Sequence, residues 1–178
     1  RPPRSTLFPD TTLFRSDAIY EVGKKDNISN FGTYAVNSLR MEKAYRGWGA
    51  ELTGEISLVE AGMDRFFNLN KKSNFIGSKV LREKLQSRVD IKIVYLEIDV
   101  DGADARGNEP VYHNNKIVGV VTSGGYGFRI NKSLAFAYVQ SELAKDGIEL
   151  LVKIQGQKRK AKILNAPAYD SQNKKLKS

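Results

Sequence analysis

The sequence contains no cysteine, a single histidine and a single tryptophan in 178 residues. Without cysteine, disulfides and thiol nucleophiles are excluded, and a reducing compartment is permitted. One histidine, His113, cannot build a histidine-rich metal site or a conventional catalytic triad, and its "HNNK" surroundings predict a surface turn. No apolar run reaches the roughly 18 residues of a membrane-spanning helix, so no membrane partner is expected.

Positive charge is concentrated at the two ends of the chain. The formal net charge is +9, of which residues 1–16 carry +2 and residues 158–178 carry +6. The body between them is therefore almost neutral, whereas a nucleic-acid-binding face needs basic residues spread over the folded surface. We expect no nucleic-acid partner, and we interpret residues 171–178 as a solvated basic tail.

Residues 1–16, "RPPRSTLFPDTTLFRS", differ from the rest of the sequence. They show no helical or strand periodicity and are too polar for a signal peptide. They closely resemble a translated sequencing-adaptor read-through, so we expect a non-native leader. The biological sequence is then entered near Asp17, with its true N-terminus missing.

The segment 17–87 mixes helix and loop signals. Residues 17–30 indicate the end of a helix closed by Gly23, and residues 78–87 indicate a second helix. The pattern over residues 34–45 fits a helix or a strand, while residues 57–70 have the composition of a strand. A domain boundary is expected near residue 88.

Residues 88–170 carry short strand patterns about ten residues apart. A clear strand covers residues 90–100, and a hairpin turns at "HNNK", residues 113–116. The glycine-rich stretch 122–127, "TSGGYG", lacks the spacing of a phosphate-binding loop and predicts a tight turn. Acidic residues 99, 101 and 104 predict a solvated loop rather than a calcium site. The pattern indicates an antiparallel barrel or sandwich.

Arg40 lies among apolar residues, just before a Gly-Trp-Gly sequence. Because an unpaired buried charge is costly, the guanidinium needs a partner. An internal partner, Glu42 or Glu51, is one possibility. The other is an anionic ligand, with Trp48 offering a flat face for stacking. The residues alone favour the structural interpretation and leave the ligand open.

Several ordered motifs resemble the aminomethyltransferase superfamily. "SLRMEKAYRGWGAEL", "EAGM" and "NFIG" are similar to the second half of its folate-binding module, and "GNEP" and "TSGGYG" are similar to its C-terminal barrel. The resemblance covers roughly residues 28–170. The forms "EKAYRGWG", "GNEP" and "TSGGYG" are closer to the dimethylglycine and sarcosine dehydrogenases than to the glycine-cleavage T-proteins.

The resemblance implies an α+β fold: the C-terminal half of the folate-binding module over residues 17–87, then an antiparallel β-barrel over residues 88–170. It implies transfer of one carbon from a small N-methyl amine to tetrahydrofolate. By similarity, Arg40, Trp48 and Tyr169 are the expected folate-binding residues. Glu60 matches the family's P-x-E glutamate, although Leu58 replaces the proline.

The family's catalytic aspartate and the dehydrogenases' FAD domain have no counterpart in this sequence, so no catalytic residue is assigned. We therefore expect a C-terminal fragment of a dimethylglycine or sarcosine dehydrogenase-like enzyme, inactive by itself. A T-protein aminomethyltransferase and a folate-binding regulatory module without turnover are the alternatives. The expected location is the cytoplasm, or the mitochondrial matrix if the source is eukaryotic.

Overall fold

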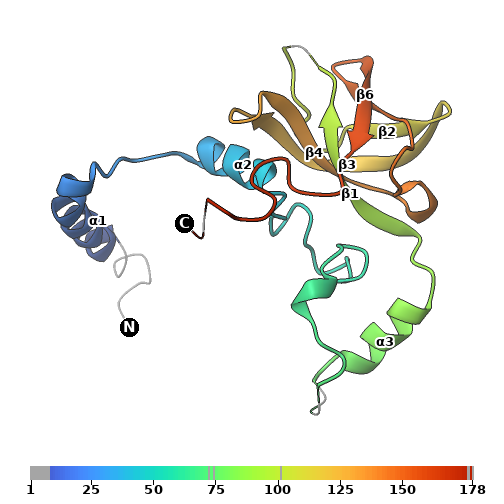
Figure 1. The fold of residues 1–178 in the computed structure, drawn as a ribbon, viewed down its shortest axis with the longest axis horizontal. Helices are drawn as coiled ribbons and strands as arrows, with labels where there is room; N and C mark the ends of the chain where they lie inside the picture. The colour runs from blue at the N-terminus through green and yellow to red at the C-terminus, as the bar shows by residue number, and fades with distance from the viewer. Residues whose placement is uncertain (1–8, 72, 74, 101, 176, 178) are drawn as a thin grey trace. The chain divides into compact units, whose positions relative to one another are not determined.

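The computed structural model describes residues 9–71, 73, 75–100, 102–175 and 177 (Figure 1). These residues form two compact units, one ending at Thr33 and the other beginning at Tyr34. The first unit contains helix α1 (Pro9–Gly23) and the single 3-10 turn η2 (Lys24–Asp26). Asn27, with a left-handed φ of 55°, ends η2, and its backbone N–H donates to the carbonyl of Lys24.

Helix α1 ends at Gly23, as the sequence predicts. The helix also includes residues 9–16 of the expected leader, so it crosses the expected junction at Asp17. Residues 1–8 lie outside the described part of the chain. The non-native origin of residues 1–16 stays a prediction.

The second unit is built on a closed antiparallel barrel. Its strands are β1 (Ile91–Ile98), β2 (Pro110–His113), β3 (Lys116–Gly127), β4 (Lys132–Gln140), β5 (Leu150–Ile154) and β6 (Gln157–Ile163). The order around the barrel is β1-β4-β3-β2-β5-β6, and β6 pairs with β1 to close it. Closure leaves no unpaired sheet edge. Of the two predicted alternatives, the barrel is confirmed and the sandwich is wrong.

Strands β1 and β4 are buried on both faces. The alternate residues Val94, Leu96 and Ile98 of β1 enter the barrel core. Their neighbours Ile93 and Tyr95 point to the other face, where they join Met41 of helix α2 in a second apolar cluster. Because side chains alternate along a strand, one short segment serves both clusters. The second cluster fixes α2 to the outside of the barrel.

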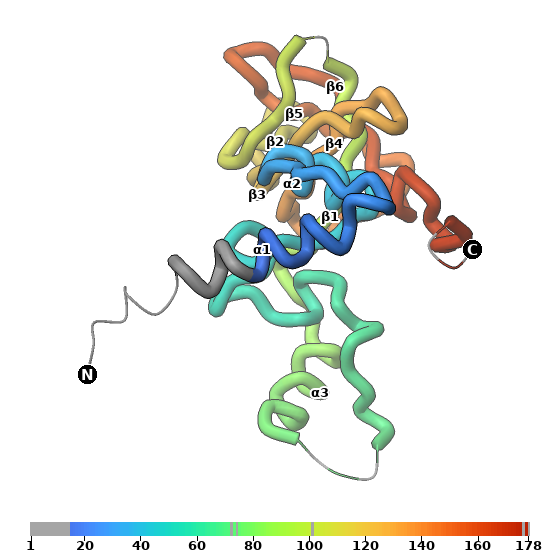
Figure 2. The backbone as a smooth tube through the Cα atoms, turned by 90° about the vertical axis from the view of Figure 1, so that its left-hand side faces the viewer, coloured from blue at the N-terminus to red at the C-terminus, as the bar shows by residue number. Residues whose placement is uncertain are grey.

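Helix α2 (Thr33–Glu42) resolves the ambiguity of residues 34–45 in favour of a helix. An irregular segment follows, with the 3-10 turn η3 (Asp64–Phe66) and helix α3 (Ser78–Gln86), and Figure 2 traces its path to β1. A last 3-10 turn, η4 (Ser141–Leu143), follows β4. The helix predicted at residues 78–87 is confirmed. The predicted boundary near residue 88 falls between α3 and β1 and stays a prediction.

The strand predicted at residues 57–70 is wrong. Glu60 folds back to accept hydrogen bonds from the backbone and hydroxyl of Ser57, which closes a local turn. Gly62 then takes a left-handed φ of 59°, which extended backbone excludes. Local turn chemistry therefore overrides the strand-like composition.

The hairpin at residues 113–116 is confirmed, and the tight turn at residues 122–127 is wrong. Asn114 and Asn115 have φ values of 48° and 64°, as the turn between β2 and β3 requires. Residues 122–127 are instead the end of strand β3. Their glycines serve close contact: a Cβ on Gly124 would lie 2.4 Å from the carbonyl oxygen of Ala105. In the described part of the chain, no helix is long and apolar enough to cross a membrane.

Candidate functional site

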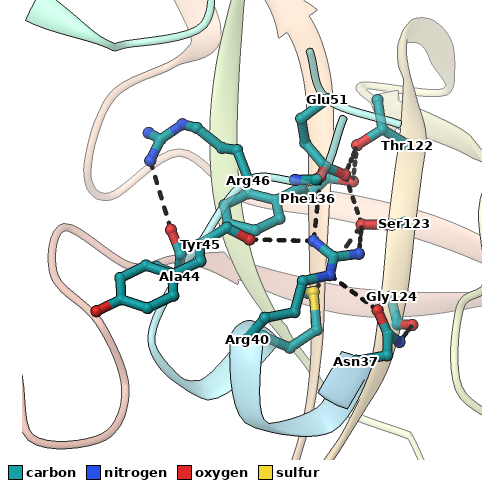
Figure 3. Close-up of polar contacts among 12 residues, drawn as sticks. Asn37, Arg40, Ala44, Tyr45, Arg46, Glu51, Thr122, Ser123, Gly124 and Phe136 are labelled. Atoms are coloured by element: carbon teal, nitrogen blue, oxygen red, sulfur yellow. Dashed lines mark hydrogen bonds and ion pairs between the residues drawn. The ribbon is translucent and has the colours of Figure 1, made fainter. Parts of the chain in front are cut away.

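The most concentrated polar cluster lies where helix α2 meets strand β3 (Figure 3). At its centre, Nη1 of Arg40 and Oε2 of Glu51 form an ion pair of 3.1 Å. The Glu51 side chain is completely buried, and that of Arg40 is 19% exposed. A fully buried carboxylate requires compensation from several partners, because desolvation alone would make its charged form costly.

Glu51 receives that compensation from three further donors. Its Oε2 accepts the backbone N–H of Gly47 at 2.7 Å. Its Oε1 accepts the hydroxyl groups of Thr122 and Ser123 at 2.7 and 2.5 Å. One carboxylate thereby ties the loop after α2 to strand β3. The backbone carbonyl of Glu51 also accepts the phenol of Tyr138 at 2.9 Å.

Arg40 is held almost as completely as Glu51. Its Nε donates to Oδ1 of Asn37 at 2.9 Å, and Nη2 donates to the Ser123 hydroxyl at 2.9 Å. Besides Glu51, Nη1 also donates to the backbone carbonyl of Tyr45 at 3.1 Å. Among the described residues, four of the five N–H groups of the guanidinium therefore have partners. A single N–H on Nη2 is left for a ligand, which excludes a bidentate grip in this conformation.

The cluster depends on backbone positions that only small residues allow. Asn37 donates Nδ2 to the Gly124 carbonyl at 3.2 Å, and a Cβ on the next residue, Gly125, would lie only 3.1 Å from that nitrogen. Ser38 likewise donates to the carbonyl of Tyr126 at 2.7 Å. Helix α2 thus lies directly on the glycine-rich end of β3, and this contact brings Arg40 to Ser123.

Trp48 lies in the loop between Arg40 and Glu51 and is 83% exposed. Its backbone forms an isolated bridge with Leu52, and the backbone N–H of Gly49 donates to the Leu52 carbonyl at 2.8 Å. The Gly-Trp-Gly sequence is therefore a closed turn that presents the indole to solvent rather than to the core. An exposed aromatic face on an anchored loop can stack against a flat ligand.

Tyr169 lies after the last strand and is anchored to the end of α2. Its backbone N–H donates to the carbonyl of Glu42 at 3.0 Å. Two cations lie over its ring, with the guanidinium of Arg129 5.7 Å and the Nζ of Lys175 5.4 Å from the centroid. Glu42 is itself buried and accepts the backbone N–H of Arg129 at 2.6 Å.

The three expected folate residues, Arg40, Trp48 and Tyr169, lie on neighbouring segments of the backbone. In the described part of the chain, no hydrogen bond or ring contact joins any two of these side chains. Arg40 and the anchor of Tyr169 share helix α2, and Trp48 follows in the loop. Of the two internal partners predicted for Arg40, Glu51 is correct and Glu42 is wrong. Their use as a folate site stays a prediction.

The basic tail is anchored at its beginning. Lys43 donates to the carbonyl of Asp170 at 2.7 Å and to Oδ1 of Asn173 at 2.6 Å. Its Nζ also lies 3.6 Å from the Asp170 carboxylate. The expected solvated tail therefore begins with a turn fixed to the end of α2. Residues 176 and 178 lie outside the described part of the chain.

Burial sets the titration of the tyrosines near this cluster. Burial raises the pKa of Tyr138 to about 12, and the nearby Glu51 carboxylate acts in the same direction. Burial likewise raises the pKa of Tyr95, whose phenol donates to the Met41 carbonyl at 2.7 Å. Both phenols are therefore neutral hydrogen-bond donors at physiological pH and are not available as bases.

No metal site is formed within the described ranges, where no cluster of three or more His, Asp or Glu side chains occurs. His113 is the last residue of β2, and its Nδ1 lies 2.9 Å from the carbonyl oxygen of Glu149. Asp99 and Asp104 lie in a loop, and Asp101 is outside the described residues.

The sequence interpretation missed Asn37, Thr122 and Ser123. The last two belong to the "TSGGYG" stretch, for which the sequence predicts a tight turn, and such a turn gives their hydroxyl groups no partner in residues 34–51. A helix pattern for residues 34–45 would have placed Asn37 three residues before Arg40, on the same helix face. That i, i+3 spacing is the feature of the sequence that indicates Asn37 as a partner of Arg40.

Two family profiles match most of the chain between them. The profile described as "Glycine cleavage T-protein C-terminal barrel domain" matches residues 92–170. The profile described as "GCVT N-terminal domain" matches residues 10–71. The first match coincides with the observed barrel, and the second contains Arg40, Glu51 and Trp48.

Individual proteins agree with these profiles. The mitochondrial dimethylglycine dehydrogenase of Homo sapiens is 42% identical over 151 residues, which are 85% of this chain and 17% of that protein. An aminomethyltransferase of Synechocystis sp. is 34% identical over 161 residues, covering 86% of this chain and 43% of that protein. The chain thus spans less than half the length of these relatives.

A solved structure supports the same fold. The crystal structure of glycine cleavage system aminomethyltransferase T from Bartonella henselae superposes with a TM-score of 0.71 at 26% identity. The superposition covers 77% of this chain and 38% of that one. Together with the profile matches and the closed barrel, this similarity shows that the chain belongs to the aminomethyltransferase superfamily.

Proposed function

We propose that the chain provides the C-terminal part of a tetrahydrofolate-dependent enzyme that takes one carbon from an N-methyl amine. The observation that carries the proposal is the 42% identity with human dimethylglycine dehydrogenase, against 34% with the Synechocystis aminomethyltransferase. The sequence forms "EKAYRGWG", "GNEP" and "TSGGYG" favour the dehydrogenase branch as well. The amine is dimethylglycine or sarcosine in this proposal.

In the proposed enzyme, this chain forms one wall of the folate site. Trp48 stacks on the folate rings or on the aminobenzoyl linker, since its indole is exposed on an anchored loop. Arg40 donates its remaining N–H to an anionic or carbonyl oxygen of folate, and Glu51 keeps the guanidinium in place. Tyr169 packs against the ligand from the segment anchored on α2.

The folate in this proposal supplies the nitrogen atoms that capture the one-carbon unit. The residues of this chain bind and orient that cofactor, and none of them is assigned to proton transfer. Oxidation of the amine is assigned to a flavin domain outside this sequence. The chain alone is therefore expected to be inactive in both dehydrogenase and aminomethyl-transfer assays.

A second candidate is the aminomethyl transfer reaction of the glycine-cleavage T-proteins. The TM-score of 0.71 with the Bartonella protein favours it, because that match covers 77% of this chain, which is more than the barrel alone. That reaction needs no flavin and takes the carbon from an aminomethyl group on a lipoyl carrier.

The discriminating experiment uses a longer protein, encoded by the natural gene, in which native sequence replaces residues 1–16 and extends further upstream of Asp17. The longer protein is expressed and given tetrahydrofolate with dimethylglycine, with sarcosine, or with an aminomethyl-lipoyl carrier protein. Formation of methylenetetrahydrofolate from either amine, with reduction of a bound flavin, supports the proposal. Turnover with the carrier alone supports the second candidate. Turnover by residues 17–178 alone contradicts the expected dependence on a further domain.

A further inference from the structure

A polar pocket lies on the outer face of the barrel, and Glu51 and its hydrogen-bond partners do not line it. It has a volume of about 280 Å³ and is bounded by the loop after α2, the segment around η3 and the residues after β6. Its apolar floor includes Tyr95 of β1 and Phe136 of β4, whose rings lie 5.1 Å apart. Two arginines, Arg46 and Arg65, line its rim.

Arg46 is fixed in this pocket by contacts that leave its charge without an ion-pair partner among the described residues. Its Nε donates to the carbonyl of Ala61 at 2.7 Å, and Nη1 is 3.4 Å from the carbonyl of Ala44 (Figure 3). The guanidinium lies over the Phe136 ring, 5.7 Å from the centroid. These neutral groups orient the side chain but provide no negative charge.

Arg65 adds a second uncompensated charge to the same pocket. Its only ring contact described is with Phe66, 4.8 Å from the guanidinium carbon to the centroid. Among the ion pairs of the described residues, none involves Arg46 or Arg65. The carboxylates of Glu51 and Asp64 act favourably on the Arg46 charge, but neither forms an ion pair with it.

The two arginines act on each other unfavourably. Burial lowers the pKa of Arg46, and repulsion by Arg65 lowers it further. The third cation of the pocket, Lys43, is already compensated by Asp170 and Asn173. Both guanidinium groups line this pocket, and each is a planar fork of donors that matches the oxygen atoms of a carboxylate or phosphate.

The glycine at position 62 keeps this set of donors open. A Cβ at this position would lie 3.3 Å from Nη2 of Arg46, the guanidinium nitrogen for which no hydrogen bond is described. Gly62 also has a left-handed φ of 59°, so a larger residue would strain the backbone there. The free edge of the Arg46 guanidinium therefore remains accessible from the pocket.

We propose that the pocket between residues 43–46, 62–65 and 164–173 binds a small oxyanion, a carboxylate or a phosphate, through Arg46 and Arg65. The anion removes the repulsion between the two guanidinium groups. The neighbouring aromatic floor lowers the local dielectric and strengthens the charge-assisted hydrogen bonds. None of the three proposed folate residues, Arg40, Trp48 and Tyr169, lines this pocket.

The test is a titration of the 178-residue chain with inorganic phosphate and, separately, with succinate at constant ionic strength. The NMR signal of the Arg46 Nε–H group reports on the pocket, and that of Arg40 serves as an internal reference. Saturable movement of the Arg46 signal, with a stationary Arg40 signal, is the expected result. Saturation with only one of the two anions supports the site and identifies its ligand as phosphate or carboxylate.

Arg65→Gln is the decisive variant, because Arg65 is exposed and its loss is not expected to disturb the fold. It should weaken anion binding about tenfold or more, the effect of losing one charge-assisted hydrogen bond. Arg106→Gln, which removes an exposed arginine outside the pocket, should bind as the parent chain does. Movement that never saturates with either anion, or equal affinity in the Arg65→Gln variant, overturns the proposal.

Discussion

The guanidinium of Arg40 and the carboxylate of Glu51 lie 3.1 Å apart across a loop that displays the only tryptophan of the chain. The pair does more than balance charge, since Glu51 also holds Gly47, Thr122 and Ser123. The exposed Trp48 is thus presented by a loop whose two sides are fixed to the barrel and to helix α2.

Replacing Glu51 with alanine is expected to destabilise the chain by about 3–5 kcal/mol, because the Arg40 guanidinium would lose its carboxylate partner in a mostly buried position. Urea-induced unfolding followed by far-UV circular dichroism measures the change in free energy. Glu55→Ala removes an exposed glutamate from the same loop region and should shift the unfolding free energy by no more than about 0.5 kcal/mol. Equal behaviour of the two variants would show that the buried pair contributes little.

Replacing Gly124 with alanine is expected to cost more than about 2 kcal/mol, because the new Cβ would meet the Ala105 carbonyl oxygen at 2.4 Å. The matched control is Gly54→Ala, since Gly54 has open space around it and no left-handed φ. The thermal midpoints of the two variants provide the comparison. A Gly124→Ala chain as stable as the control would mean that β3 and the Ala105 loop can separate freely.

Glu60 gives the stability a specific acid dependence. Burial acts to raise its pKa, but hydrogen bonds from Ser57 and the nearby Lys84 outweigh burial and lower the pKa below its usual 4.5. A lowered folded-state pKa means that the charged form stabilises the fold above about pH 4.5. That contribution is lost as the pH falls through the folded-state pKa.

The Glu60→Gln variant tests this dependence. Its unfolding free energy should be lower than that of the parent chain at neutral pH, and the difference should narrow as the pH falls below about 4.5. Glu83→Gln, an exposed change on helix α3, should show a constant small difference over the same range. A Glu60→Gln difference that stays constant with pH would rule out the proposed linkage.

Much of the barrel was predictable from the sequence because its strands alternate strongly and are separated by clear turn residues. Asn114 and Asn115 are an example, since both tolerate the left-handed backbone of a hairpin turn. The glycines of β3 cannot be interpreted from the sequence, because their role depends on residues elsewhere in the chain. At Gly124, for example, the carbonyl of Ala105 lies too close for any side chain. Residues 57–70 were misassigned because the Ser57–Glu60 turn outweighs composition.

The candidate site was only half predictable. Arg40 needed a partner, and Glu51 was one of two candidates, but the choice depends on how the loop after α2 closes. Ser123 could not be identified, since 83 residues separate it from Arg40 and only the docking of α2 on β3 brings them together. Arg46 and Arg65 line one pocket only because of the path of the irregular segment after α2, and no periodicity in the sequence predicts that path.

The most direct test of the proposed folate site is a calorimetric titration of the longer protein with tetrahydrofolate, comparing the parent form with Trp48→Ala. The indole is exposed, so the thermal midpoint should be unchanged while the affinity falls about threefold to tenfold. Phe66→Ala, an exposed aromatic change at another position, is the control and should bind tetrahydrofolate normally. An unchanged affinity in Trp48→Ala would contradict the assignment of this loop to the folate site.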